Sequence, residues 1–376
     1  MRATVADVMA AMEEVAPSHL AESWDNVGLQ IGDPSAPVTK VHVALDGTPD
    51  VVASAIEDGA QVLITHHPLI FSGMKRLDLS TPLGKILAQS VTAPLAIYSA
   101  HTNLDSAPEG LNHAFAEMLG LKDLKPLVQA ESQQHVKLAF FVPESHRDSV
   151  MEALWTSSAG TIGGYSCCSF ASSGHGTYLP GGDSKPFAGE VGALSREPEL
   201  RVEVSVTEAG LKHAVKALKA AHPYETLEYN VYPMAASAGS DARDVGLGRF
   251  GCFEKPIPLK EVVARIKEAM GMDLVKVAGD MDKTIESAAL CTGSGSSLMK
   301  AFYGSGADLY ISGELKYHDA QVVLERGGAM IDAGHFETEH FVCTHLSALL
   351  SREFAKMGVN IEVVPSRVER PVFSIE

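Results

Sequence analysis

Short apolar segments and amphipathic helical segments alternate along the first third of the chain. The apolar positions after Thr4 have helical spacing, and an acidic residue follows Thr4 by three positions, which predicts a capped amphipathic helix. The segments 38–46, 61–65 and 94–100 are short and apolar, as buried strands are. Helical segments separate them, so we expect parallel strands joined by crossover helices.

This alternation changes between residues 128 and 235, where the pattern predicts strand, helix, strand, strand, helix and strand. That order is typical of a ferredoxin-like α+β domain. The α/β alternation returns after 235–248, a stretch of small and polar residues typical of a linker. We therefore predict a discontinuous α/β domain with mostly parallel sheets, formed by 1–127 and 236–376 and interrupted by an insertion, 128–235.

Composition and charge narrow the classes of partner. The chain has 376 residues and a formal charge of −17, because 47 acidic residues outnumber 30 basic ones. We see no run of Lys or Arg, so phosphate backbones would repel the chain and we do not expect nucleic acid as a partner. The five cysteines form no Cys-x-x-Cys pair, as expected for reduced thiols, and no segment is apolar enough to span a bilayer. We therefore expect a cytoplasmic protein with no membrane partner.

Two clusters of polar residues directly follow predicted strands. His66 and His67 are adjacent, and their side chains would point in opposite directions. They would therefore bind two neighbouring cations, one each, rather than chelate a single cation. A surface histidine pair is the alternative. His101 and Asp105 face one way if the chain turns helically there, and imidazole with carboxylate suits a divalent metal. An Asp that only forms a turn is the alternative.

Two further pairs are spaced four residues apart, near the starts of predicted helices. His335 and Glu339 would share one helix face, where a carboxylate can bridge two ions; the alternative is an acidic helix start favoured by the helix dipole. Glu314 and His318 would act as general base and proton carrier, or form a solvated helix start. Together the clusters place imidazoles and carboxylates at the carboxyl ends of strands, a suitable ligand set for two divalent cations.

Two other segments leave two interpretations open. The loop 292–297 (TGSGSS) would either cradle an anion with its backbone N–H groups or form a tight strand-to-helix turn, and it lacks the P-loop pattern. The segment 24–26 (WDN) would reach the polar clusters, or its Trp24 would lie in the core.

The motifs resemble, in order and spacing, those of the Nif-three-like dinuclear metal proteins, also called GTP cyclohydrolase I type 2 homologues. The matching segments are SWDNVGLQIG (23–32), THHPLIF (65–71), HTNLD (101–105), GSGSSL (293–298), ISGE (311–314) and GHFETE (334–339). The resemblance implies a metal pair held by His66, His67, Asp105, His335 and Glu339, with Glu339 as the bridge and His101 close by. Zinc, iron and manganese all accept such ligands.

The resemblance also implies a toroidal homohexamer, and it identifies 128–235 as similar to the PII/CutA-like insertion of the longer family members. Our leading hypothesis is a metal-dependent hydrolase acting on a nucleotide-like or phosphorylated small molecule, in which Glu314, His318 or His101 carries the proton. A protein that binds or delivers metal without turnover, or an interaction scaffold, is the alternative. A third possibility is that the histidines are only structural.

Overall fold

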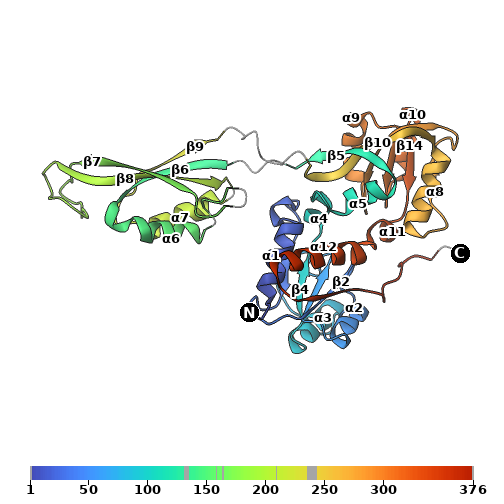
Figure 1. The fold of residues 1–376 in the computed structure, drawn as a ribbon, viewed down its shortest axis with the longest axis horizontal. Helices are drawn as coiled ribbons and strands as arrows, with labels where there is room; N and C mark the ends of the chain where they lie inside the picture. Colours follow the sequence, from blue (N-terminus) through green and yellow to red (C-terminus); the bar gives the residue numbers. More distant parts are fainter. Residues whose placement is uncertain are drawn as a thin grey trace. The chain divides into compact units, whose positions relative to one another are not determined.

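The computed structural model describes residues 2–130, 135–157, 159–162, 165–208, 210–234 and 244–374. The chain forms two compact units, Met1–Ala130 with Ala242–Glu376 and, inserted between these segments, Glu131–Asp241 (Figure 1). The predicted class, a discontinuous α/β domain with an α+β insertion, is confirmed.

The first unit contains two sheets, and the first of them is built mainly from parallel strands. Its strands, in spatial order, are β1 (Gly28–Ile31), β4 (Ala96–Ser99), β3 (Val62–Thr65), β2 (Lys40–Ala44) and β15 (Glu362–Pro365). All pairs are parallel except β1 with β4. Helices α1 (Val5–Val15) and α12 (Val342–Met357) pack on one face, and α2 (Pro49–Glu57) and α3 (Pro82–Thr92) on the other (Figure 1). Burial on both faces explains the continuous apolar segments in the sequence.

The second sheet of this unit is mixed. Its strands, in spatial order, are β11 (Lys276–Ala278), β14 (Ala329–Asp332), β13 (Leu309–Ser312), β12 (Thr284–Cys291), β10 (Gly246–Pro258) and β5 (Leu121–Gln129). Only β12, β13 and β14 are parallel to one another. Helices α5 (Leu111–Met118) and α8 (Leu259–Met270) pack on one face, and α9 (Met299–Ser305) and α10 (Tyr317–Glu325) on the other. The remaining helices are α4 (Thr102–Ser106), α11 (His335–Glu339), and the 3₁₀ turns Ser18–Leu20 and Ser296–Leu298.

The structure corrects three local expectations in this unit. Strand β10 begins at Gly246, within the stretch expected to be a linker; positions 235–243 of that stretch lie outside the described residues. The sequence pattern predicts a helix from Glu314 to Glu325, but α10 begins at Tyr317, because Lys316 is extended and forms its N-cap. The sequence pattern predicts one long helix from about 338 to 357, but the structure has two helices, α11 and α12. The predicted cap of α1 is confirmed, since Thr4 and Asp7 form a capping box.

The inserted unit has its own four-stranded antiparallel sheet and hydrophobic core. In spatial order the strands are β7 (Ser169–Tyr178), β8 (Ser195–Thr207), β6 (His135–Pro143) and β9 (Tyr229–Pro233), with α6 (Arg147–Trp155), α7 (Leu211–Ala221) and the 3₁₀ turn Glu144–His146. Buried side chains of α6 and α7 pack on the sheet. This is the strand-helix-strand-strand-helix-strand order expected from the sequence.

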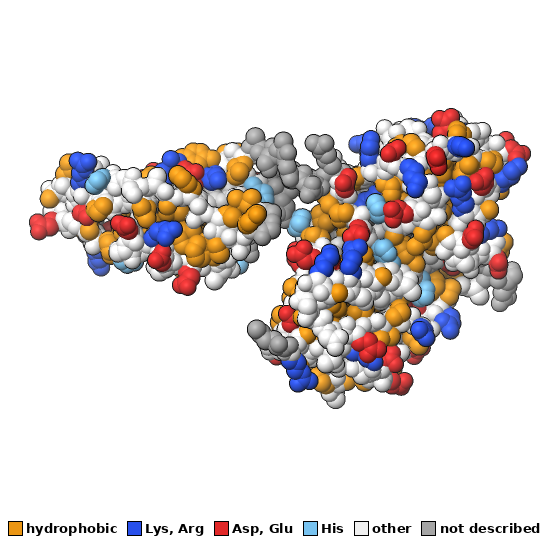
Figure 2. Space-filling model, viewed as in Figure 1, with side chains coloured by type: hydrophobic (Ala, Val, Ile, Leu, Met, Phe, Trp, Pro, Cys, Tyr) orange, Lys and Arg blue, Asp and Glu red, His pale blue; other side chains and the backbone are white. Residues whose placement is uncertain are grey.

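Two surface properties bear on partners. On the face drawn in Figure 2, Lys and Arg side chains are interspersed with Asp and Glu, as expected for an acidic chain without a basic run. Among the described residues, no helix combines the length and the apolar character that crossing a membrane requires.

Candidate metal centre

Three imidazoles and two carboxylates meet in the first unit, each just after a parallel strand. His66 and His67 directly follow β3. Asp105 lies in α4, the short helix after β4, while His335 and Glu339 lie at the two ends of α11, which follows β14. The carboxyl ends of strands in both sheets therefore supply one cluster, because these strands are parallel within each sheet.

Glu339 lies at the middle of this cluster. Its side chain is nearly inaccessible, at 3% exposure, and its Oε2 lies 3.0 Å from Nε2 of both His67 and His335. Its other oxygen, Oε1, lies 3.8 Å from Nε2 of His66. Burial by itself would raise the pKa of Glu339, but its hydrogen bonds with the imidazoles outweigh burial and hold the pKa well below its usual range. Glu339 is therefore an anion that offers different oxygens to His66 and His67.

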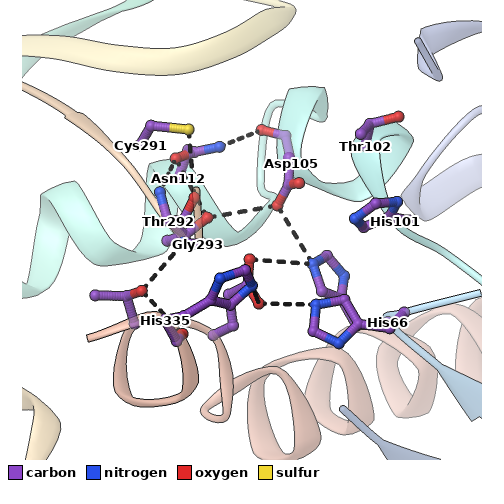
Figure 3. A network of polar contacts seen from close by, with 12 residues as sticks. His66, His101, Thr102, Asp105, Asn112, Cys291, Thr292, Gly293 and His335 are labelled. Carbon is purple, nitrogen blue, oxygen red and sulfur yellow. Dashed lines mark hydrogen bonds and ion pairs between the residues drawn. The ribbon is translucent and has the colours of Figure 1, made fainter. Parts of the chain in front are cut away.

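His66 carries the feature that most clearly indicates a metal. Its Nδ1 lies 2.8 Å from the Ala100 carbonyl oxygen, which only accepts hydrogen bonds, so Nδ1 carries a proton and Nε2 is the ring atom left for a metal. That buried Nε2 has no hydrogen-bond partner among the residues that the structure describes. It lies 3.8 Å from both Asp105 Oδ1 and Glu339 Oε1, and Figure 3 shows the Asp105 carboxylate directed at the ring. A buried imidazole nitrogen that faces two carboxylates from beyond hydrogen-bond distance costs free energy, and a cation among them would remove that cost.

The other imidazoles are held in a common way, with Nδ1 hydrogen-bonded to a carboxylate. Such bonds fix the tautomer and leave Nε2 available to a metal. The pairs are His67 with Asp46 at 2.8 Å, His101 with Asp25 at 3.0 Å and His335 with Glu314 at 3.2 Å.

His101 lies beside His66 and His67, with ring centroids 5.2 and 5.6 Å away, and the nitrogens of the three imidazoles lie within 4.8 Å of one another. Its partner Asp25 has no exposed side-chain surface and also accepts hydrogen bonds from Thr102. Burial opposes ionisation of Asp25, but the hydrogen bonds with His101 and Thr102 prevail and lower its pKa strongly. Asp25 thus presents a fixed negative charge to His101.

The structure separates Glu314 from His318. Glu314 is exposed but reaches His335, whereas His318 is exposed on α10, where its Nδ1 lies 3.0 Å from Gln321 Oε1. Because α10 starts only at Tyr317, Glu314 and His318 do not share a helix face. The structure therefore brings Glu314, but not His318, to the cluster.

The role of Asp46 was not predicted from the sequence, and that of Asp25 was left open. Asp46 is the last residue of the predicted strand 38–46, so the strand-end rule that selected His66 would also have found it. Trp24, for which a core position was one interpretation, is instead 56% exposed. Its ring centroid lies 5.9 Å from Phe71 and 6.0 Å from His101, so an exposed aromatic pair borders the cluster.

The loop 292–297 passes very close to Glu339. Gly293 has φ +59°, and a Cβ added there would lie 1.9 Å from Glu339 Oε1 and 3.2 Å from His335 Nε2. Its N–H donates to Thr338 Oγ1 at 3.1 Å. This glycine lets the backbone approach the carboxylate, as the tight-turn interpretation expects; anion binding by the loop stays a prediction.

We expect the stability of the metal-free protein to fall as pH rises from about 6.5 to about 10. Burial lowers the pKa of His67, but hydrogen bonds with Asp46 and Glu339 outweigh it and raise the pKa to about 10. The hydrogen bond with Glu339 raises the pKa of His335 to about 9 despite burial. Both folded-state values exceed the unfolded value of about 6.5, so this stabilisation is complete below that pH and is lost above it. Denaturant unfolding across this range would measure it; a rise in stability would contradict the expectation.

Asp46→Asn should weaken metal binding without removing a ligand. The amide does not carry the charge that makes the His67 imidazole more basic, and such outer contacts typically change metal affinity about 10–100-fold. Metal titration by calorimetry would measure the loss, with Asp50→Asn, at an exposed position of α2, as the control. Equal affinities for the two variants would show that Asp46 does not support the centre.

Comparison with known proteins matches nearly the whole chain to one protein family. The model of the family Duf34/NIF3 (NGG1p interacting factor 3) matches residues 3–371. A Halalkalibacterium halodurans protein named GTP cyclohydrolase 1 type 2 homolog is 35% identical over 367 residues, which cover 98% of this chain and 97% of that protein. A Mycobacterium tuberculosis protein of the same name is 34% identical over 361 residues, 94% of this chain and 93% of that one. The crystal structure of a Bacillus cereus protein related to NIF3 aligns over 100% of both chains, with a TM-score of 0.71 and 32% identity.

Proposed function

The chain belongs to the DUF34/NIF3 family, and from this we propose that it binds two divalent cations and hydrolyses a nucleotide-like or phosphorylated small molecule. The proposed ligands are His66, His67, Asp105, His335 and Glu339. The observation that carries the proposal is the buried Nε2 of His66, which has no hydrogen-bond partner among the described residues and faces two carboxylates. Zinc, iron or manganese would suit these donors.

Two overlapping groups of donors support a pair of cations. His66 and His67 belong to one group, in which His101 is a neighbour rather than a proposed ligand, and the other group consists of His67, His335 and Glu339. The donor atoms of each group lie within 4.8 Å of one another. Glu339 supports this reading because one of its oxygens lies near His66 and the other contacts His67 and His335. When bound, two such cations would activate water and polarise the bond under attack.

In this proposal the protein residues orient the ligands and move a proton. Asp46 and Glu314 hold the imidazoles of His67 and His335 through Nδ1. His101 accepts or donates a proton at Nε2, and the Asp25 carboxylate on its Nδ1 fixes the orientation of the ring. Proton transfer by Glu314 or His318 stays a prediction from the sequence.

The exposed aromatic pair beside the cluster supports a substrate with a planar ring. Trp24 and Phe71 are 56% and 54% exposed, and their ring centroids lie 5.9 Å apart. Aromatic side chains at a binding surface stack on nucleobases. The relatives named GTP cyclohydrolase 1 type 2 homolog are consistent with a nucleotide-like substrate.

Turnover of a substrate panel by metal-loaded and metal-stripped protein tests the proposal. GTP, other nucleotides and phosphomonoesters would be screened for released phosphate and for opening of the base. We expect turnover only with metal, and a loss of about 10²–10⁴-fold in kcat for His101→Gln with metal content retained. His113→Gln, at a half-buried position of α5, is the matched control.

Metal binding at full occupancy without turnover anywhere in the panel would contradict the hydrolase and support the alternative, a protein that binds or delivers metal. One observation favours that alternative. Glu314 and His318 were predicted to move protons as a pair, but Glu314 is hydrogen-bonded to His335, whereas His318 lies on the surface of α10. The two residues therefore do not form a proton-transfer pair in this structure.

We also propose that the chain acts as a homo-oligomer, a ring of six as the family resemblance implies. Light scattering on the purified protein should then give six times the chain mass of 39.9 kDa. The mass of a single chain would contradict the ring.

A further inference from the structure

A second cluster of metal-binding side chains lies outside the centre described above. His340 follows α11 directly and Cys343 lies in the first turn of α12, while Glu369 lies in the segment after β15. Glu369 Oε2 lies 3.3 Å from Cys343 Sγ and 3.7 Å from His340 Nε2. All three donor atoms lie within 4.8 Å of one another.

The spacing of these atoms suits a tetrahedral zinc-type ion. Zinc binds thiolate sulfur at about 2.3 Å and imidazole nitrogen or carboxylate oxygen at about 2.0–2.2 Å, so neighbouring ligand atoms lie roughly 3.3–3.6 Å apart. The two distances from Glu369 Oε2 are close to that range. The third pair of donor atoms, Cys343 Sγ and His340 Nε2, lies within 4.8 Å.

Burial makes the cluster costly without an ion. Cys343 is 2% exposed and Glu369 9% exposed. His340 Nε2 is buried and makes no hydrogen bond within the described part of the chain, although its ring is fixed by stacking on Phe336 at 4.5 Å. An unpaired buried imidazole nitrogen is unfavourable, and a cation would satisfy it.

The carboxylate of Glu369 is held in place by the backbone. Its Oε1 accepts hydrogen bonds from the N–H groups of Leu45 at 3.0 Å and Asp46 at 2.8 Å, at the end of β2. Its Oε2 lies 3.2 Å from the same Leu45 N–H and also faces Cys343 and His340. Outer hydrogen bonds of this kind orient metal ligands.

We propose that His340, Cys343 and Glu369 form a separate site for one zinc-type cation, which joins the C-terminal segment to β2 and to the α11–α12 junction. On binding, the Cys343 S–H proton leaves to solvent, and a sulfur–metal bond replaces the hydrogen bond from Sγ to Glu369. No oxidation or reduction takes place. The site depends neither on hydrolysis nor on occupancy of the first centre.

Cobalt titration of the full chain tests this site by its sulfur ligand. The proposed ligands of the first centre are nitrogen and oxygen donors, so thiolate-to-cobalt charge transfer in the near ultraviolet would report a cysteine ligand alone. We expect this band in the wild-type protein, its loss in Cys343→Ser, and its displacement by added zinc. Cys291→Ser is the matched control, since Cys291 is also buried and lies outside the cluster.

Glu369→Gln keeps the test decisive if Cys343→Ser fails to fold. It retains the sulfur but removes the carboxylate charge, so the band should require at least about tenfold more cobalt. No band in the wild-type protein, a band that persists in folded Cys343→Ser, or one lost only in Cys291→Ser would each overturn the site.

Discussion

Glu339→Gln is expected to remove the bound cations while leaving the fold in place. The amide keeps the size of the side chain, but it takes away the anion that lies within 3.8 Å of three imidazoles. Loss of an outer contact costs about 10–100-fold in metal affinity, so loss of a shared ligand should cost more than about 100-fold. Elemental analysis of gently purified protein would measure metal per chain, with about two expected for wild type and near zero for the variant.

The matched control is Glu337→Gln, on the same short helix. Glu337 is a half-buried acidic residue outside the two donor groups, so it separates the charge of α11 from the ligand role of Glu339. In metal-free protein, Glu339→Gln should also destabilise the fold by about 3–5 kcal/mol below pH 6.5, because it leaves protonated imidazoles without their buried partner. Normal metal content in Glu339→Gln would refute the assignment of Glu339.

Gly293→Ala is expected to weaken metal binding at the centre, although it replaces none of the proposed ligands. Its Cβ would lie 1.9 Å from Glu339 Oε1, so either the carboxylate or the loop must shift. A displaced ligand should cost at least the 10–100-fold in affinity typical of a disturbed outer contact. Calorimetric metal titration of the folded variant would measure this loss.

Gly306→Ala is the control that distinguishes displacement of the Glu339 carboxylate from backbone strain. Gly306 has φ +73°, close to that of Gly293, but an added Cβ there meets nothing within 4 Å among the described residues. Both variants therefore carry the left-handed strain of about 1–2 kcal/mol, and only Gly293→Ala disturbs Glu339. Equal metal affinities in the two variants would show that the close approach of Gly293 does not matter.

The strands that the sequence pattern predicts most clearly are buried on both faces of their sheets. The residues of β3 are all buried, as are those of β4 and β13, and each segment is apolar up to its last residue. β5 was not predicted, because most of its residues are exposed or half-buried and it pairs at the edge of its sheet. β1 was missed for the same reason, since all four of its residues are half-buried.

The sequence by itself determined the fold class, the ferredoxin-like order of the insertion and the ligand candidates at strand ends. These depend on local spacing, which records the face of each element that is buried and the point where it ends. Only the tertiary structure decided that Glu339 contacts His67 across 272 positions, that Asp46 holds His67, and that His318 lies apart. The first contact joins residues that follow strands of two different sheets, and the second joins the ends of the paired strands β2 and β3. Local spacing carries no information on which elements become neighbours in the fold.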